Sequence, residues 1–106
     1  MMQINPWEVW YAAVRFEDTP EVKLRPVVVT SANEVVVLAL KVTTHPPREC
    51  WGEYALQQWE AAGLKKQSTV RIGKRLRLEH KDMRDKVGRL HPLDIINIQR
   101  FLAEKR

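Results

Sequence analysis

The chain has 106 residues, enough for one domain with one modest hydrophobic core and too few for most two-domain enzymes. Hydrophobic residues make up 44% of it and charged residues 29%, which excludes a disordered chain and favours a globular one. The formal net charge is +5, but it is unevenly placed: residues 1–53 carry 5 Lys and Arg against 7 Asp and Glu, and residues 54–106 carry 13 against 6. We therefore expect the second half of the chain to bind a polyanion.

The first half of the chain predicts three β-strands. Residues 9–16 are rich in aromatic and β-branched side chains, and alternation places Trp10 and Val14 on the same face. A polar loop follows, and then two more strands are expected at residues 26–30 and 35–42. Both of these are continuous apolar runs, so we expect both of their faces to be covered, in a compact barrel or sandwich.

The second half predicts two helices and a hairpin. Residues 51–62 repeat apolar and aromatic side chains at intervals of three and four, which predicts a helix, and Gly63 suits its left-handed C-cap. Residues 69–72 and 75–79 predict two short strands that turn at a Gly-Lys pair. A C-terminal helix is expected to start near Pro92. The sum is a mainly β fold: one domain over residues 1–106, a small bent barrel of about five strands, with one inserted and one C-terminal helix.

Cysteine and histidine are too sparse for an internal disulfide or a structural metal site. The single cysteine, Cys50, suits a reducing compartment, and three scattered histidines give no zinc-ligand spacing. The N-terminal residues lack the charged and apolar regions of a signal peptide, and the longest apolar run, residues 35–40, is far shorter than the ~20 residues that span a bilayer. We therefore expect a soluble cytoplasmic protein that uses no metal or other cofactor.

Four landmarks follow one another along the chain: Leu24-Arg25-Pro26-Val27-Val28-Val29, then Lys41-Val42-Thr43-Thr44, then Gly63-Leu64 ahead of Gln67-Ser68-Thr69-Val70-Arg71, and finally Val87-Gly88-Arg89-Leu90 before the last helix. In this order they resemble the PemK/MazF toxins of type II toxin–antitoxin systems, over about residues 7–102. The resemblance implies an SH3-like barrel, a homodimer and a metal-independent endoribonuclease that cuts single-stranded RNA. It also implies a cognate antitoxin as partner.

The resemblance carries over to particular residues. In the family, an arginine in the Arg-Pro signature and a threonine that ends the next long strand form the catalytic core, and Arg25 and Thr43 match them. Arg71 matches a further arginine that takes part in some members, but Gly73 stands where these members have an aspartate. The Gly-Asp or Gly-Glu that commonly opens the first strand is also replaced, by Pro6-Trp7-Glu8.

Each candidate has a chemical reading and a structural one. A metal-free ribonuclease needs a cation for the phosphorane charge, and Arg25 suits this role, although it could equally pair with acids of the preceding loop. Thr43 can donate a hydrogen bond to a phosphate oxygen, or it can simply be a good strand residue. An imidazole can donate or accept a proton near neutral pH, so His45 is a candidate acid or base, or else an ordinary loop histidine.

A dense basic segment follows in residues 65–89. Its ten cations are Lys65, Lys66, Arg71, Lys74, Arg75, Arg77, Lys81, Arg84, Lys86 and Arg89. Such a run is often only a solvated face, but Arg75 and Arg77 share one side of a strand. We therefore take Arg71, Lys74, Arg75 and Arg77 as candidate RNA-binding residues. Trp7 and Trp51 are candidates for stacking on bases.

Two classes of function are open at this point. The first is an endoribonuclease toxin neutralised by an antitoxin. The second is a non-catalytic SH3-like binding module or a toxin of the gyrase-inhibitor type, which shares this fold. The second reading is motivated by Gly73 at the position of a possible catalytic acid and by the dense basic segment.

Overall fold

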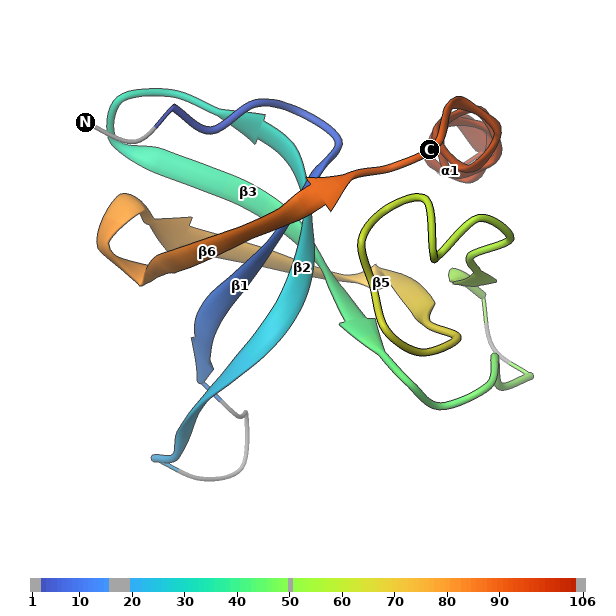
Figure 1. The fold of residues 1–106 in the computed structure, drawn as a ribbon, viewed down its shortest axis with the longest axis horizontal. Coiled ribbons are helices and arrows are strands. Elements are labelled where there is room, and N and C mark those ends of the chain that lie inside the picture. Colours follow the sequence, from blue (N-terminus) through green and yellow to red (C-terminus); the bar gives the residue numbers. More distant parts are fainter. Residues whose placement is uncertain (1–2, 16–19, 50, 105–106) are drawn as a thin grey trace.

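The computed structural model describes residues 3–15, 20–49 and 51–104 (Figure 1). Within them the chain forms six strands, a 3-10 helix and one α-helix: β1 (Glu8–Arg15), β2 (Val22–Ala32), β3 (Val36–Thr43), β4 (Glu53–Ala55), β5 (Thr69–Glu79), η1 (His80–Asp82), β6 (Met83–Arg89) and α1 (Pro92–Glu104). All strand pairs are antiparallel, in the order β4-β5-β3-β2-β1-β6. The predicted mainly β fold and the C-terminal helix are confirmed. No helix in the described ranges is long and apolar enough to cross a membrane.

The sheet is covered on both faces, as its apolar runs predict. Successive residues of β2 enter different clusters: Val28 packs with Leu40 and with Ile98 of α1, whereas Val27 packs with Trp10. Val27 and Val28 are both fully buried. Because side chains alternate across a strand, two buried neighbours require cover on opposite faces. Here α1 covers one face, and Leu78 of β5 and Met83 of β6 pack on the other.

The helix predicted over residues 51–62 is wrong. Tyr54 belongs to β4, where it pairs with Val70, and residues 58–63 form turns. The apolar spacing is real, because Leu56 and Ala62 are buried in the core, but they reach it from a short strand and from irregular turns. Gly63 adopts the predicted left-handed conformation, with φ of 92°, but it ends a turn rather than a helix.

The predicted hairpin is also wrong, because β5 is one continuous strand from Thr69 to Glu79. The Gly-Lys pair lies in a bulge: Lys41 of β3 pairs with Arg71, while its neighbour Leu40 pairs with Arg75. The backbone amides of Ile72 and Gly73, in this bulge, both donate hydrogen bonds to the carbonyl oxygen of Gly52. The shorter of the two, from Ile72, has a nitrogen–oxygen distance of 2.5 Å.

Two further boundaries differ from the prediction. β2 begins at Val22 rather than at Pro26, because its first residues pair with the end of β1, where Val22 faces Arg15. β6 was not predicted at all. It is an edge strand in which only Met83 is buried, so it lacks the apolar alternation from which strands are read.

Candidate active site

A cleft opens where β2 and β3 separate. The last pair between these strands is Val27 with Lys41. Beyond it, β2 stays paired with β1, so that Arg25 faces Ala12, and β3 stays paired with β5. Pro26 lies directly before Val27 in the chain, at the first position where β2 no longer pairs with β3. A proline has no N–H to donate, which suits a point where the ladder ends. The strand ends therefore form two walls of a cleft.

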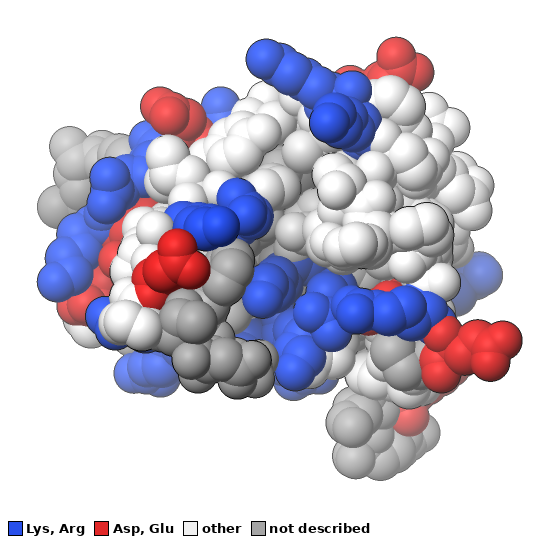
Figure 2. All heavy atoms as spheres, turned by 90° about the horizontal axis from the view of Figure 1, so that it is seen from below, with Lys and Arg blue, Asp and Glu red and all other residues white. Residues whose placement is uncertain are grey.

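This cleft has a volume of about 630 Å³ and a strongly cationic lining. Figure 2 shows Lys and Arg side chains gathered around a hollow on the face that is seen from below in Figure 1. Among the described residues that line it, none is Asp or Glu, and six are cations: Arg25, Lys41, Arg48, Lys65, Lys66 and Arg71. An anionic ligand is therefore favoured by Coulomb attraction and by hydrogen-bond donors together.

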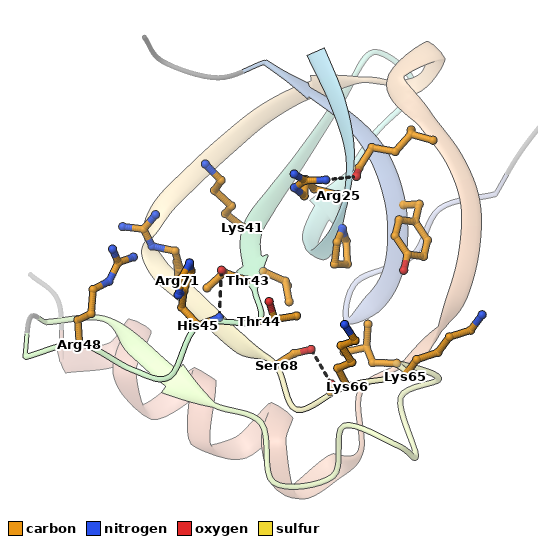
Figure 3. A pocket seen from close by; sticks show the side chains of 15 residues that line it. Arg25, Lys41, Thr43, Thr44, His45, Arg48, Lys65, Lys66, Ser68 and Arg71 are labelled. Atoms are coloured by element: carbon orange, nitrogen blue, oxygen red, sulfur yellow. Dashed lines mark hydrogen bonds between the residues drawn. The ribbon is translucent and has the colours of Figure 1, made fainter. Parts of the chain in front are cut away.

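Four of the residues singled out in the sequence meet in this cleft: Arg25, Thr43, His45 and Arg71 (Figure 3). The half-buried Arg25 guanidinium donates to the carbonyl of Leu24, 3.0 Å away. Thr43 Oγ1 accepts from the backbone amide of His45, at 3.3 Å. Because Thr43 uses only its acceptor in this bond, its hydroxyl proton can serve another group.

The loop after β3 is fixed by two hydroxyls. The amide of His45 donates to Thr43 Oγ1, and its carbonyl accepts a hydrogen bond from Thr69 Oγ1, at 2.6 Å. Thr69 is buried and lies opposite Thr43 in the β3–β5 ladder. The exposed imidazole of His45 thus projects from a held backbone, directly at the cleft.

The other three basic candidates lie outside the cleft. Lys74 belongs to the bulge of β5, and Arg75 and Arg77 lie further along that strand, opposite Leu40 and Leu38. Arg77 lines a separate, smaller hollow of about 270 Å³. Arg75 and Arg77 are exposed on the same side of β5, as predicted, but they do not face the group around Arg25.

A buried carboxylate stands behind one wall of the cleft. Glu53 of β4 faces Arg71 across the β4–β5 ladder, and its Oε2 lies 3.1 Å from Arg71 Nε and 3.1 Å from Arg48 Nη2. Hydrogen bonds from the backbone and side chain of Arg48, with the charges of both arginines, lower the pKa of Glu53 to about 2. In the described ranges, no three His, Cys, Asp or Glu side chains come together as a metal site requires.

Four residues of this region were not recognised as site residues in the sequence: Tyr11, Lys41, Arg48 and Glu53. Tyr11 had a signal, because alternation along β1 places it on the face opposite Trp10, and its side chain is 38% exposed at the cleft. Lys41 also has a signal in the sequence, because it directly precedes Val42-Thr43 in the second landmark. Arg48 and Glu53 have no such signal, because they come together only through the turn that replaces the predicted helix.

Comparisons with known proteins agree with this architecture. A solved structure described as an endoribonuclease in complex with its cognate antitoxin, from a mycobacterial species, superposes with a TM-score of 0.77 at 18% identity, covering 96% of this chain and 93% of that one. A second, described as an endoribonuclease from a mycobacterial species, gives 0.75 at 18% identity, covering 98% and 91%. At this identity the likeness establishes a shared fold.

No curated protein sequence matches the chain. A family model does match it, over residues 5–105, and this model describes the PemK-like, MazF-like toxins of type II toxin–antitoxin systems. The match covers nearly the whole chain and contains all four landmarks of the sequence. The protein therefore belongs to the PemK-like, MazF-like toxin family.

Proposed function

We propose that this toxin is an endoribonuclease that cuts single-stranded RNA in the cleft between β2 and β3. The observation that carries the proposal is the meeting of Arg25, Thr43 and His45 in one cationic cleft, although 20 positions separate the first from the last. The family match and the two endoribonuclease structures of the same fold support it.

RNA brings its own nucleophile to such a site. The 2′-hydroxyl loses its proton to a base and its oxygen forms a bond to the adjacent phosphorus. The bond from phosphorus to the 5′-oxygen then breaks, and this oxygen takes up a proton from an acid. The products are a 2′,3′-cyclic phosphate and a 5′-hydroxyl. The protein has to supply a base, an acid and a stabiliser of the phosphorane charge.

The cleft offers a group for each of these tasks. The planar guanidinium of Arg25 can hold two phosphate oxygens and stays charged at every working pH. The Thr43 hydroxyl can donate to a phosphate oxygen, because its present bond uses only its acceptor. His45 is the candidate acid or base, and the lysines Lys41 and Lys65 favour the polyanionic chain.

The proposal includes partners. One of the similar structures is described with a cognate antitoxin, and the family is that of toxin–antitoxin systems, so we propose an antitoxin that neutralises this chain in the cytoplasm. As the family resemblance implies, we also propose a homodimer. Sedimentation of the purified protein tests the dimer, and co-purification with the protein of a neighbouring short reading frame tests the antitoxin.

The test of the activity is direct. Purified protein is incubated with a long single-stranded RNA in excess EDTA, and the fragments are examined by gel and by their ends. Discrete fragments with cyclic phosphates support the proposal. Intact RNA with folded protein overturns it. Growth arrest with intact RNA and damaged DNA would instead favour the gyrase-inhibitor type of toxin.

A further inference from the structure

Glu53 is a charged residue that the proposed chemistry does not use. Its side chain is only 3% exposed, and it does not line the cleft. Both of its oxygens are nevertheless occupied: Oε1 accepts from the backbone amide of Arg48 at 2.8 Å, and Oε2 accepts from Arg48 Nη2 and from Arg71 Nε. One buried carboxylate therefore ties the loop after β3 to the beginning of β5.

The two arginines that it holds do line the cleft. A guanidinium is planar and rigid, so a hydrogen bond at Nε fixes its plane and leaves its terminal nitrogens for other acceptors. Among the described residues, no side chain accepts from the terminal nitrogens of Arg71, whose Nε is bound to Glu53. The side chain of Arg48 is 54% exposed, so an exposed arginine in a loop would sample several rotamers. Its hydrogen bonds to Glu53 restrict it to one direction.

The position of this pair complements that of Arg25. β3 lies between β2 and β5 in the sheet, so Arg25 approaches the end of β3 from one side and Arg71 from the other (Figure 3). An RNA strand carries a phosphate at every nucleotide. An RNA strand whose scissile phosphate contacts Arg25 and Thr43 therefore presents a neighbouring phosphate to other cations along the same cleft.

We propose that Glu53 is a positioning residue: it holds Arg48 and Arg71 as a second phosphate-binding site of the cleft, for a backbone phosphodiester next to the one that is cut. The identity of the ligand rests on the proposed function. The carboxylate itself is not a proton donor, because a group with a pKa of about 2 is ionised at neutral pH. Its role is to fix the direction of two cations.

The test compares two glutamates that differ in surroundings but not in charge. Glu53→Gln keeps the shape and removes the charge. Glu79→Gln is the matched control, because Glu79 is 67% exposed and forms an ion pair only with Lys81 among the described residues. Binding of a single-stranded 2′-O-methyl RNA, which lacks the nucleophile and cannot be cut, is measured by fluorescence anisotropy at several salt concentrations.

Removal of an anion near a basic cleft should by Coulomb's law alone tighten the binding of RNA. If Glu53 positions the arginines, Glu53→Gln instead weakens it about 5-fold or more relative to Glu79→Gln. The slope of log K against log salt also becomes shallower, by about 0.7 for each RNA phosphate that the variant no longer neutralises. Equal or tighter binding by Glu53→Gln, with an unchanged slope, overturns the inference.

Two further measurements test the same role, and the first of them needs no variant of Glu53. In the wild-type protein, slow hydrogen exchange at Nε of Arg71 is expected by NMR, and fast exchange at this position contradicts the inference. In an Arg48→Ala/Arg71→Ala background, adding Glu53→Gln should cause no further loss of binding, and a full further loss contradicts it. Because the probe RNA cannot be cut, these results are independent of cleavage, whose absence on ordinary RNA overturns only the proposed activity.

Discussion

Arg25 and Thr43 stand at equivalent places on neighbouring strands, each two residues beyond the last β2–β3 pair, Val27 with Lys41. Had the ladder continued, the two residues would face each other as an ordinary cross-strand pair, with no room for a ligand between them. Because the strands separate first, both residues line a cleft instead. The end of one ladder thus converts two strand residues into two walls of a candidate active site.

The Thr43 hydroxyl can be tested by isosteric substitution. Thr43→Val removes the hydroxyl at nearly constant shape and should lower kcat on RNA by about 100-fold, the typical effect of losing one donor to transition-state charge. Thr43→Ser keeps the hydroxyl and should stay within about 5-fold of the wild type. Thr30→Val is the matched control, because Thr30 donates to the Leu38 carbonyl at 3.1 Å, outside the cleft. Equal losses in Thr43→Val and Thr30→Val would argue against a role in the reaction.

Tyr11 is the aromatic residue that the cleft offers to an RNA base. Stacking of one base is typically worth ~1–3 kcal/mol, so Tyr11→Leu should weaken the binding of uncleavable single-stranded RNA by roughly 5- to 160-fold. Tyr11→Phe keeps the ring and should bind nearly as well as the wild type. Trp51 is 44% exposed but is absent from the lining, and its ring packs edge-on against Phe101. A larger effect of Trp51→Leu than of Tyr11→Leu would contradict this assignment.

The sequence predicted the elements whose signals are local. The apolar runs of β2 and β3 and the start of α1 at Pro92 are read correctly, because burial on both faces and helix-start chemistry leave continuous patterns. Residues 51–62 were read incorrectly, because apolar side chains that reach a core from turns can imitate the spacing of a helix. Gly73 predicted a turn, but the long-range contact with Gly52 makes it part of a bulge.

The same difference between local and long-range signals decides which residues of the candidate site can be predicted from the sequence. Arg25, Thr43 and His45 could be singled out because they lie in or beside family landmarks. The acid that accompanies Arg71 could not, because it is Glu53 on β4 rather than a residue at position 73, and the pairing of β4 with β5 exists only in the folded chain. The relation of Lys74, Arg75 and Arg77 to RNA stays a prediction, since they lie outside the cleft.

Trp7 occupies a position that favours glycine. Its φ is 69°, in the left-handed region, and its backbone is held there by hydrogen bonds with Val29 and Leu90. Both Trp7→Gly and Trp7→Ala lose the packing of the indole against the core. Trp7→Gly should nevertheless be the more stable of the two, by about 1 kcal/mol or roughly 4–8 °C in Tm, because only alanine pays the left-handed penalty. Calorimetry of the two variants measures the difference, and the opposite order would contradict the backbone assignment.

Glu8 should contribute to the loss of folding stability at acid pH. Burial alone would raise the pKa of this carboxyl, but hydrogen bonds from Asn5, Trp10 and Lys86 outweigh burial and lower it to about 2. A depressed folded-state pKa contributes stability that is present above the ordinary value of 4.5 and is lost as the pH falls toward 2. The fall of the pKa from 4.5 to about 2 corresponds to a contribution of about 3 kcal/mol.

Glu8→Gln isolates this contribution. Between pH 5 and about pH 2, urea unfolding should show a smaller loss of stability in Glu8→Gln than in the wild type, since the variant has no proton to take up at this position. The loss that remains in the variant comes from the other acids, Glu53 included. Parallel pH curves for the two proteins would show that Glu8 has an ordinary pKa in the folded state.

We expect cleavage to depend on the cleft rather than on the basic character of the chain. Arg25→Ala and Arg77→Ala each remove one arginine, but Arg25 lines the cleft and Arg77 lines the separate hollow beside Asn33. On one single-stranded RNA in EDTA, at equal salt concentration and saturating RNA, Arg25→Ala should lower kcat at least about 100-fold. Arg77→Ala should keep kcat within about 3-fold of the wild type, because an RNA-binding residue outside the cleft changes KM instead. Equal rates for the two variants, whether both slow or both fast, would show that cleavage does not depend on the cleft in particular.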